Sequence, residues 1–165
     1  KLIIDARKLL SRKQIDEFAI PILFVELESG QNGTLTQYPG QGIGQTWLGA
    51  DGATITLPAA VGSGDEYRFF IATAISSNSY IIKVADATDT ISGAVHMVDA
   101  DDDSQTTITA KGTDDTVTLN GGTTSGGALG ETLTFTDIAT NKYVVQGNLI
   151  VPAGSDPADP FSATV

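Results

Sequence analysis

The densest group of side chains that can bind a metal is the acidic run at residues 99–103. The carboxylates of Asp99, Asp101 and Asp103 match the start of a calcium-binding loop, and calcium prefers oxygen ligands. Such a loop needs glycine at its sixth position and glutamate at its twelfth, where this chain has Ser104 and Ala110. No helix–loop–helix context is indicated either. We therefore expect a solvated turn between two strands, with a calcium site as the alternative.

The sequence offers few residues for catalysis. It contains no cysteine and one histidine, His96, which lies in the apolar run 94–98. A single histidine in a strand is more often a structural or surface residue than a general base. The sequence has no G-x-S-x-G motif, and no P-loop or G-x-G-x-x-G motif follows a strand and opens a helix. We expect no catalytic residue, no bound metal and no cofactor, so the predicted protein is not an enzyme.

The charge of the chain excludes one class of partner and divides the sequence in two. Nine basic residues against 20 acidic ones give a net charge of −11 over 165 residues. This sign is wrong for binding phosphate backbones, so nucleic-acid binding is not expected. Residues 1–28 carry five bases and five acids, whereas residues 29–165 carry four bases and 15 acids. No apolar run is long enough to span a membrane, and no signal-peptide pattern is visible.

The N-terminal segment has the pattern of a short helix. Ser11 and Gln14 match a capping box, and Leu10 and Ile15 are placed to form a hydrophobic staple. Pro21 ends the pattern, so the sequence predicts a helix near residues 12–19. A helix of this length is not stable alone, and its apolar side chains need a cover.

A strand and a glycine-rich stretch follow this helix. Residues 22–27 have the composition of a strand, and residues 30–52 are rich in glycine and have little periodicity. The simplest interpretation of residues 30–52 is a linker or long loop; the alternative is an extended arm that becomes ordered against a partner. Trp47 and Tyr38 lie in this stretch, either packed over a sheet or anchoring a carbohydrate or a protein partner.

From residue 54 onward the pattern is typical of a small β domain. Strands recur every 10–13 residues, separated by Gly, Asn, Asp or Ser, and threonine alternates with apolar residues. The runs 67–72 and 80–84 flank polar residues and predict a hairpin. We expect a mainly β protein with an antiparallel β-sandwich or jelly-roll-like domain at residues 51–165. Residues 1–50 would form the N-terminal helix, strand and arm.

The order of several short motifs resembles that of tailed-bacteriophage virion proteins, above all head decoration (cement) proteins. In that layout an ITLPxA strand leads to a G-x-x-Y-x-F strand, an I-x-G element and a late W/Y-x-V-x-G strand. The similarity covers about residues 54–161, and Tyr143 stands where tryptophan is common. The matching segments are Thr54–Ala60, Gly64–Phe70, Ile91–Val95, Gly130–Asp137 and Asn141–Gly147.

The resemblance implies a non-enzymatic component of the virion that binds the capsid surface. Its implied partners are the major capsid protein and other copies of itself, commonly as a homotrimer. The alternative is a tail fibre, spike or receptor-binding module that recognises a glycan on the host surface. Neither alternative follows from the composition or the spacing of residues.

The contrast in charge places the expected capsid or subunit interface mainly in the N-terminal segment. An acidic body is repelled by an acidic shell, so a neutral segment with apolar and basic side chains is better suited to attachment. The competing interpretation is that this segment covers the core of its own domain. The expected interface residues are Arg7, Leu9, Leu10, Arg12, Ile15, Phe18, Phe24 and Trp47.

Overall fold

The computed structural model describes residues 22–26, 32–34, 43–121 and 123–165 of the chain. The helix predicted at residues 12–19 lies outside these residues. All regular elements of the described residues are strands, which confirms the expectation of a mainly β protein. Within the described part of the chain, no helix is long and apolar enough to cross a membrane.

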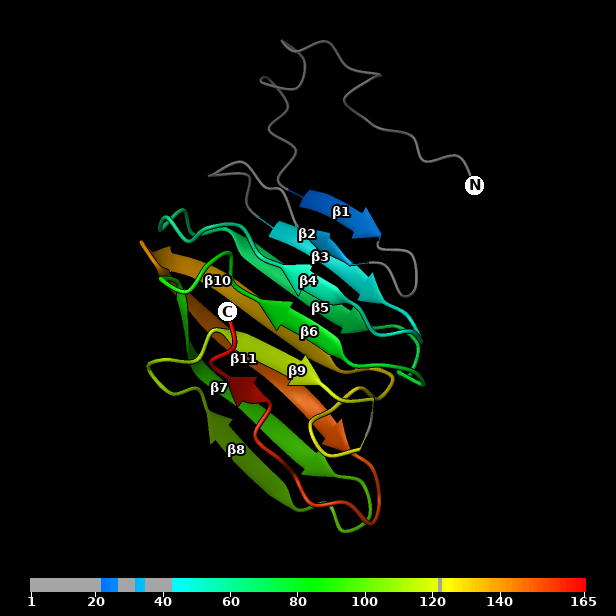
Figure 1. Ribbon diagram of the computed structural model, residues 1–165. Coiled ribbons are helices and arrows are strands. Elements are labelled where there is room, and N and C mark those ends of the chain that lie inside the picture. Colours follow the sequence, from blue (N-terminus) through cyan, green and yellow to red (C-terminus); the bar gives the residue numbers. More distant parts are fainter. Residues whose placement is uncertain (1–21, 27–31, 35–42, 122) are drawn as a thin grey trace, which may run out of the picture.

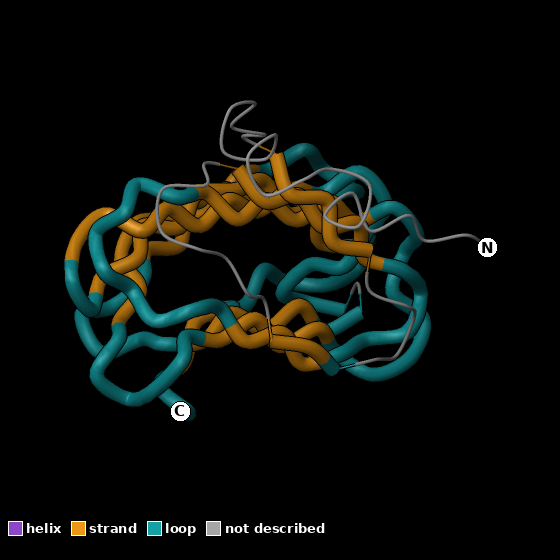
Figure 2. The backbone as a smooth tube through the Cα atoms, turned by 90° about the horizontal axis from the view of Figure 1, so that it is seen from above, coloured by secondary structure: helices purple, strands orange, loops and turns teal. Residues whose placement is uncertain are grey.

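In the described part of the chain, twelve strands form two sheets (Figure 1). The seven-stranded sheet contains, in spatial order, β1 (Ile22–Glu26), β3 (Ile43–Leu48), β5 (Glu66–Ile71), β10 (Thr132–Ala139), β11 (Lys142–Val151), β7 (Thr90–Asp99) and β8 (Gln105–Thr109). The five-stranded sheet contains β12 (Phe161–Ser162), β9 (Thr116–Leu119), β6 (Tyr80–Lys83), β4 (Thr54–Thr56) and β2 (Gly33–Thr34). Figure 2 shows the two sheets facing each other as two layers.

Both sheets are mixed, so the prediction of purely antiparallel strands is wrong. β3 lies parallel to both β1 and β5, and β11 lies parallel to β7. In the smaller sheet, β4 lies parallel to β2 and β6. Alternation of threonine with apolar residues fixes which face of a strand is buried, but it carries no information about the direction of the neighbouring strand.

The predicted hairpin of residues 67–72 and 80–84 is also wrong, because β5 and β6 belong to different sheets. The segment between them crosses from one layer to the other. Its Ile75 is buried and donates a backbone hydrogen bond of 2.9 Å to the carbonyl of Gly127. Polar turn residues mark a change of direction, but they do not distinguish a hairpin from a crossing between layers.

Two strands come from the glycine-rich stretch that was expected to form a linker or loop. β3 pairs with β5 over six residues, from Ile43 opposite Glu66 to Leu48 opposite Ile71. The two-residue β2 pairs with β4. The side chains of β3 alternate between half-buried or exposed and buried positions, as expected for a strand of a layered fold.

A single apolar core joins the two layers. Each of the longer strands contributes alternate residues to it, and the largest fully buried side chains come from both sheets. They include Tyr80, Leu119, Ile55 and Ile82 from the smaller sheet and Tyr143, Phe69, Phe135 and Met97 from the larger one. The remaining side chains of the larger sheet, which alternate with those in the core, form its outer face. This face points away from the five-stranded sheet.

Candidate functional site

Many acidic side chains are buried, and the best connected of them bind loop backbone. The carboxylate of Asp137 accepts hydrogen bonds from the backbone N–H groups of Val61, Gly62 and Ser63 at 3.0, 2.7 and 3.1 Å. Burial alone would raise its pKa, but these three bonds together with that of the Ser63 hydroxyl outweigh it and lower the pKa. Asp137 therefore acts as an ionised anchor for the loop that precedes β5.

Glu131 and Asp115 have comparable roles elsewhere. Glu131 accepts backbone hydrogen bonds of 2.7 Å from both Gly127 and Ile150, and burial raises its pKa. Asp115 accepts bonds from the backbone of Thr164 and Val165, so it fixes the C-terminal residues after β12. In these contacts each carboxylate holds backbone N–H groups in place and acts as a structural anchor. The paired acid and base of a hydrolase instead face a substrate.

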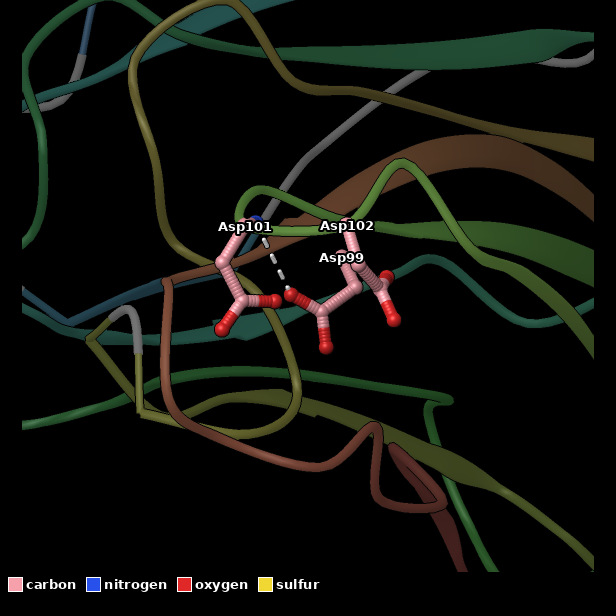
Figure 3. A group of neighbouring side chains, drawn as sticks. All are labelled: Asp99, Asp101 and Asp102. Carbon is pink, nitrogen blue, oxygen red and sulfur yellow. Dashed lines mark hydrogen bonds between the residues drawn. The ribbon is translucent and has the colours of Figure 1, made fainter.

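The acidic run forms the turn between β7 and β8, as expected, because these two strands pair antiparallel. The carboxylate oxygens of Asp99, Asp101 and Asp102 lie within 4.8 Å of one another (Figure 3). The third carboxylate of the group is therefore that of Asp102, whereas the sequence suggested Asp103. Asp99 is buried, whereas Asp101 and Asp102 are exposed.

The three carboxylates have internal partners. The backbone N–H of Asp101 donates to Asp99 at 3.1 Å, and that of Gly154 donates to Asp101 at 2.9 Å. Contact with the Asp101 carboxylate raises the pKa of Asp99, and the same contact lowers the pKa of Asp101. Three carboxylate groups supply only part of the six to eight oxygen ligands that calcium takes, so the cluster alone does not define a metal site.

His96 lies on the outer face of the larger sheet and is exposed. Its Nδ1 atom is 2.9 Å from the hydroxyl oxygen of Thr107 on the neighbouring strand β8. With Gln146 and Asn148 of β11, His96 lines a shallow hollow whose floor includes Gly93 and Gly147. Gln146 and Asn148 can donate and accept hydrogen bonds, and the hydroxyl of Thr107 is the group that His96 contacts directly.

The hollow belongs to a row of side chains that crosses the outer face from strand to strand. Each member of the row lies opposite the next in the strand register. With neighbouring strands about 4.8 Å apart, the five steps of this row span about 24 Å. From β3 to β8 the row consists of Trp47, Phe70, Thr132, Asn148, His96 and Thr107.

The row begins with two stacked aromatic rings. Trp47 is 41% exposed, and its ring lies 5.7 Å from that of Phe70 at an interplanar angle of 24°. Trp47 therefore belongs to a strand on the outer face, rather than to a loop packed over the sheet. Of the other expected interface residues, Phe24 lies in β1 opposite Gln45. Arg7, Leu9, Leu10, Arg12, Ile15 and Phe18 lie outside the described residues.

The outer face carries little charge. On β3, β5, β10, β11, β7 and β8, the outward charged residues are Glu66, Arg68 and Lys142. Glu66 and Arg68 form an ion pair of 2.6 Å with each other. These six strands therefore present a net charge near +1 on this face, in a chain whose net charge is −11. Phe70, Gln146 and Asn148 were not among the expected interface residues, although the two-residue periodicity of their strands indicates that they lie on this face.

No family model, curated protein or solved structure matches this chain.

Proposed function

We propose that this chain is a non-enzymatic capsid decoration protein of a tailed bacteriophage. It binds the major capsid protein on the outer surface of the head, as a homotrimer, and bridges and stabilises the capsid subunits. Its domain is a jelly-roll-like β-sandwich. The proposal rests on the order of motifs over residues 54–161 and on one structural observation, the broad and nearly uncharged outer face.

The charge of the outer face is what supports attachment to a protein shell. A chain of net charge −11 is repelled by another acidic surface at long range. From β3 to β8 this face presents two basic side chains and one acidic side chain, so this part of it lacks the repulsion. Its threonine, glutamine and asparagine side chains can form hydrogen bonds across a flat contact. Many symmetric copies of a modest contact also bind a capsid strongly through multivalency.

Copy number in intact particles tests this proposal. Quantitative mass spectrometry of purified particles should find the chain in amounts comparable to those of the major capsid protein. Purified protein should also bind empty capsids that lack it, and should raise the temperature at which they disassemble. A handful of copies for each particle would instead assign the chain to the tail.

The second candidate function is recognition of a glycan by a fibre or spike module, and the stacked rings of Trp47 and Phe70 favour it. An exposed aromatic ring beside polar side chains can pack against the apolar face of a sugar. Because Trp47 is the one tryptophan of the chain, its fluorescence reports directly on this place. Titration with uncharged oligosaccharides should change the emission if the second candidate is correct, and should leave it unchanged if the outer face binds only protein.

A further inference from the structure

The edge strand β8 lacks the features that usually protect a sheet edge. Among the described strands it pairs only with β7, and it ends the seven-stranded sheet. Its five residues include no charge and no proline, and four of them are exposed, with Ile108 half-buried. Natural edges are blunted by charges, proline, bulges or very short strands. The smaller sheet follows this rule, because its end strands β12 and β2 have two residues each.

The direction of the backbone groups of β8 follows from its pairing with β7. Ala110 N–H donates to the carbonyl of Gly93, and the carbonyl of Ser104 accepts from Asp99 N–H. In an antiparallel pair these groups alternate along the strand, so even-numbered residues of β8 face β7. The N–H and C=O groups of Gln105, Thr107 and Thr109 therefore face away from the sheet. They form a regular template for one more strand.

The geometry points to a second copy of this chain as the partner, with the two β8 strands paired antiparallel about a twofold axis. Thr107 lies opposite Thr107 of the other copy, and Gln105 lies opposite Thr109. This register overlaps all five residues of β8 and pairs outward-facing backbone groups only with each other. It forms about six backbone hydrogen bonds, two for each of three residue pairs.

The residues beyond the ends of β8 complement each other in the same register. This register brings the turn at Asp103 of one copy towards Lys111 of the other, and the twofold axis repeats this approach at the opposite end. Lys111 is well exposed and also pairs with Asp159 of its own chain at 2.7 Å. Uncharged side chains along β8, and Lys111 near the acidic turn of the other copy, reduce the repulsion between two acidic chains at this contact. An isologous contact of this kind closes as a pair.

This twofold contact does not depend on the proposed function, and it uses a different symmetry operator from the expected homotrimer. In a particle, β8 would join copies that belong to neighbouring trimers. The contact is therefore tested on the purified chain, without capsids.

Light scattering coupled to gel filtration should give a mass of about 34 kDa, twice the 17.1 kDa of one chain, which falls towards one chain on dilution. If the trimer also forms, the mass should rise beyond three chains. Thr107→Pro removes an N–H that faces away from β7, a position at which an edge strand tolerates proline. We expect the dissociation constant of the twofold contact to rise at least tenfold in this variant. A single-chain mass at every concentration, or association that Thr107→Pro leaves unchanged, would overturn the proposal.

A crosslink tests the register and remains informative if Thr107→Pro does not fold. Because the chain has no cysteine, Thr107→Cys introduces the only thiol. Residues directly opposite in a hydrogen-bonded pair have Cα atoms about 5.5 Å apart, which a disulfide can bridge. We expect rapid oxidation to a covalent dimer. The matched control is Thr73→Cys, at an exposed threonine between β5 and β6. Equal crosslinking rates for the two variants would contradict the twofold register.

Discussion

The carboxylate of Asp137 accepts a hydrogen bond of 2.7 Å from the backbone N–H of Gly62, which lies 75 residues earlier in the chain. Gly62 has a φ of +79°, a conformation that glycine adopts without strain. The turn at residues 61–63 thus points successive N–H groups towards one buried carboxylate. Because Asp137 lies on β10, this contact fixes the entry to β5 against its neighbour in the sheet.

Asp137→Asn should destabilise the protein while keeping its fold. The amide retains one acceptor oxygen, but its NH₂ group faces backbone donors, and the bonds to a charged acceptor are lost. We expect the free energy of unfolding to fall by roughly 2–4 kcal/mol, measured by urea denaturation at pH 7. Asp102→Asn, at an exposed residue of the acidic turn, is the matched control and should change stability little.

The stabilities of wild type and Asp137→Asn should also depend differently on pH. Since the pKa of Asp137 is lowered by folding, its ionised form contributes stability that is complete above the pKa of the unfolded chain, about 3.9. The difference in stability between wild type and Asp137→Asn should shrink as the pH falls below about 4. A difference that stays constant down to pH 2 would show that Asp137 does not act as an anion.

The sequence located most of the strands but did not reveal how they are arranged. Alternation of threonine with apolar residues located strands such as β9 and β10, because one face of each must be buried. It could not show that β11 pairs parallel with β7, since the paired residues lie 52 positions apart in the sequence. The glycine content around Ile43 hid the strand β3, whose stability comes from pairing with β5 rather than from its own composition.

The candidate surfaces were predictable only in part. The acidic run was identified as a turn, but which carboxylates gather there depends on the local conformation. Asp103 has a φ of +57°, and Asp102 joins Asp99 and Asp101 in its place. Five of the nine basic residues, and most of the expected interface, lie before residue 22 and outside the described residues.

Gly93→Ala should be among the most destabilising small substitutions in the larger sheet. Gly93 has a φ of +109°, and a Cβ atom there would collide with the carbonyl oxygen of Val145 on the adjacent β11. Backbone strain and overpacking together predict a loss of roughly 2–4 kcal/mol in the free energy of unfolding. Gly112→Ala is the matched control, because a Cβ atom there meets nothing within 4 Å. Equal stabilities of the two variants would contradict this account of β7.

Calcium should not stabilise the protein specifically. Asp99, Asp101 and Asp102 supply three carboxylates, and the sequence lacks the glutamate that completes a calcium-binding loop. A ligand that binds only the folded state raises the melting temperature. We expect calcium chloride and magnesium chloride at equal ionic strength to give the same melting temperature. A rise specific to calcium that Asp102→Asn abolishes would instead establish a metal site.

His96→Gln should leave capsid binding nearly intact. The histidine is exposed, and glutamine can still form a hydrogen bond with Thr107 across the strand pair. The dissociation constant for capsids should change by less than about tenfold, equivalent to roughly 1.4 kcal/mol. Loss of a detectable reaction product in this variant would contradict the non-enzymatic proposal.

Two truncations separate attachment to the capsid from support of the fold. Removing residues 1–21 leaves every described strand in place, whereas removing residues 1–28 also removes β1 and its five residue pairs with β3. If the N-terminal segment is the anchor, the shorter truncation should stay folded and bind capsids much more weakly. Burial of three or four apolar side chains contributes about 1.5–3 kcal/mol each before the cost of ordering the segment is subtracted.

Comparison of the two truncations also tests the competing role of this segment. The longer one uncovers the edge of β3, so we expect a lower melting temperature and more aggregation than for the shorter one. Circular dichroism and thermal unfolding measure the fold, and cosedimentation with empty capsids measures attachment. If removal of residues 1–21 already lowers the melting temperature as much as removal of residues 1–28, the segment supports the domain's own core. If the shorter truncation decorates capsids normally, the anchor lies elsewhere, and the outer face with Trp47 and Phe70 becomes the surface to mutate next.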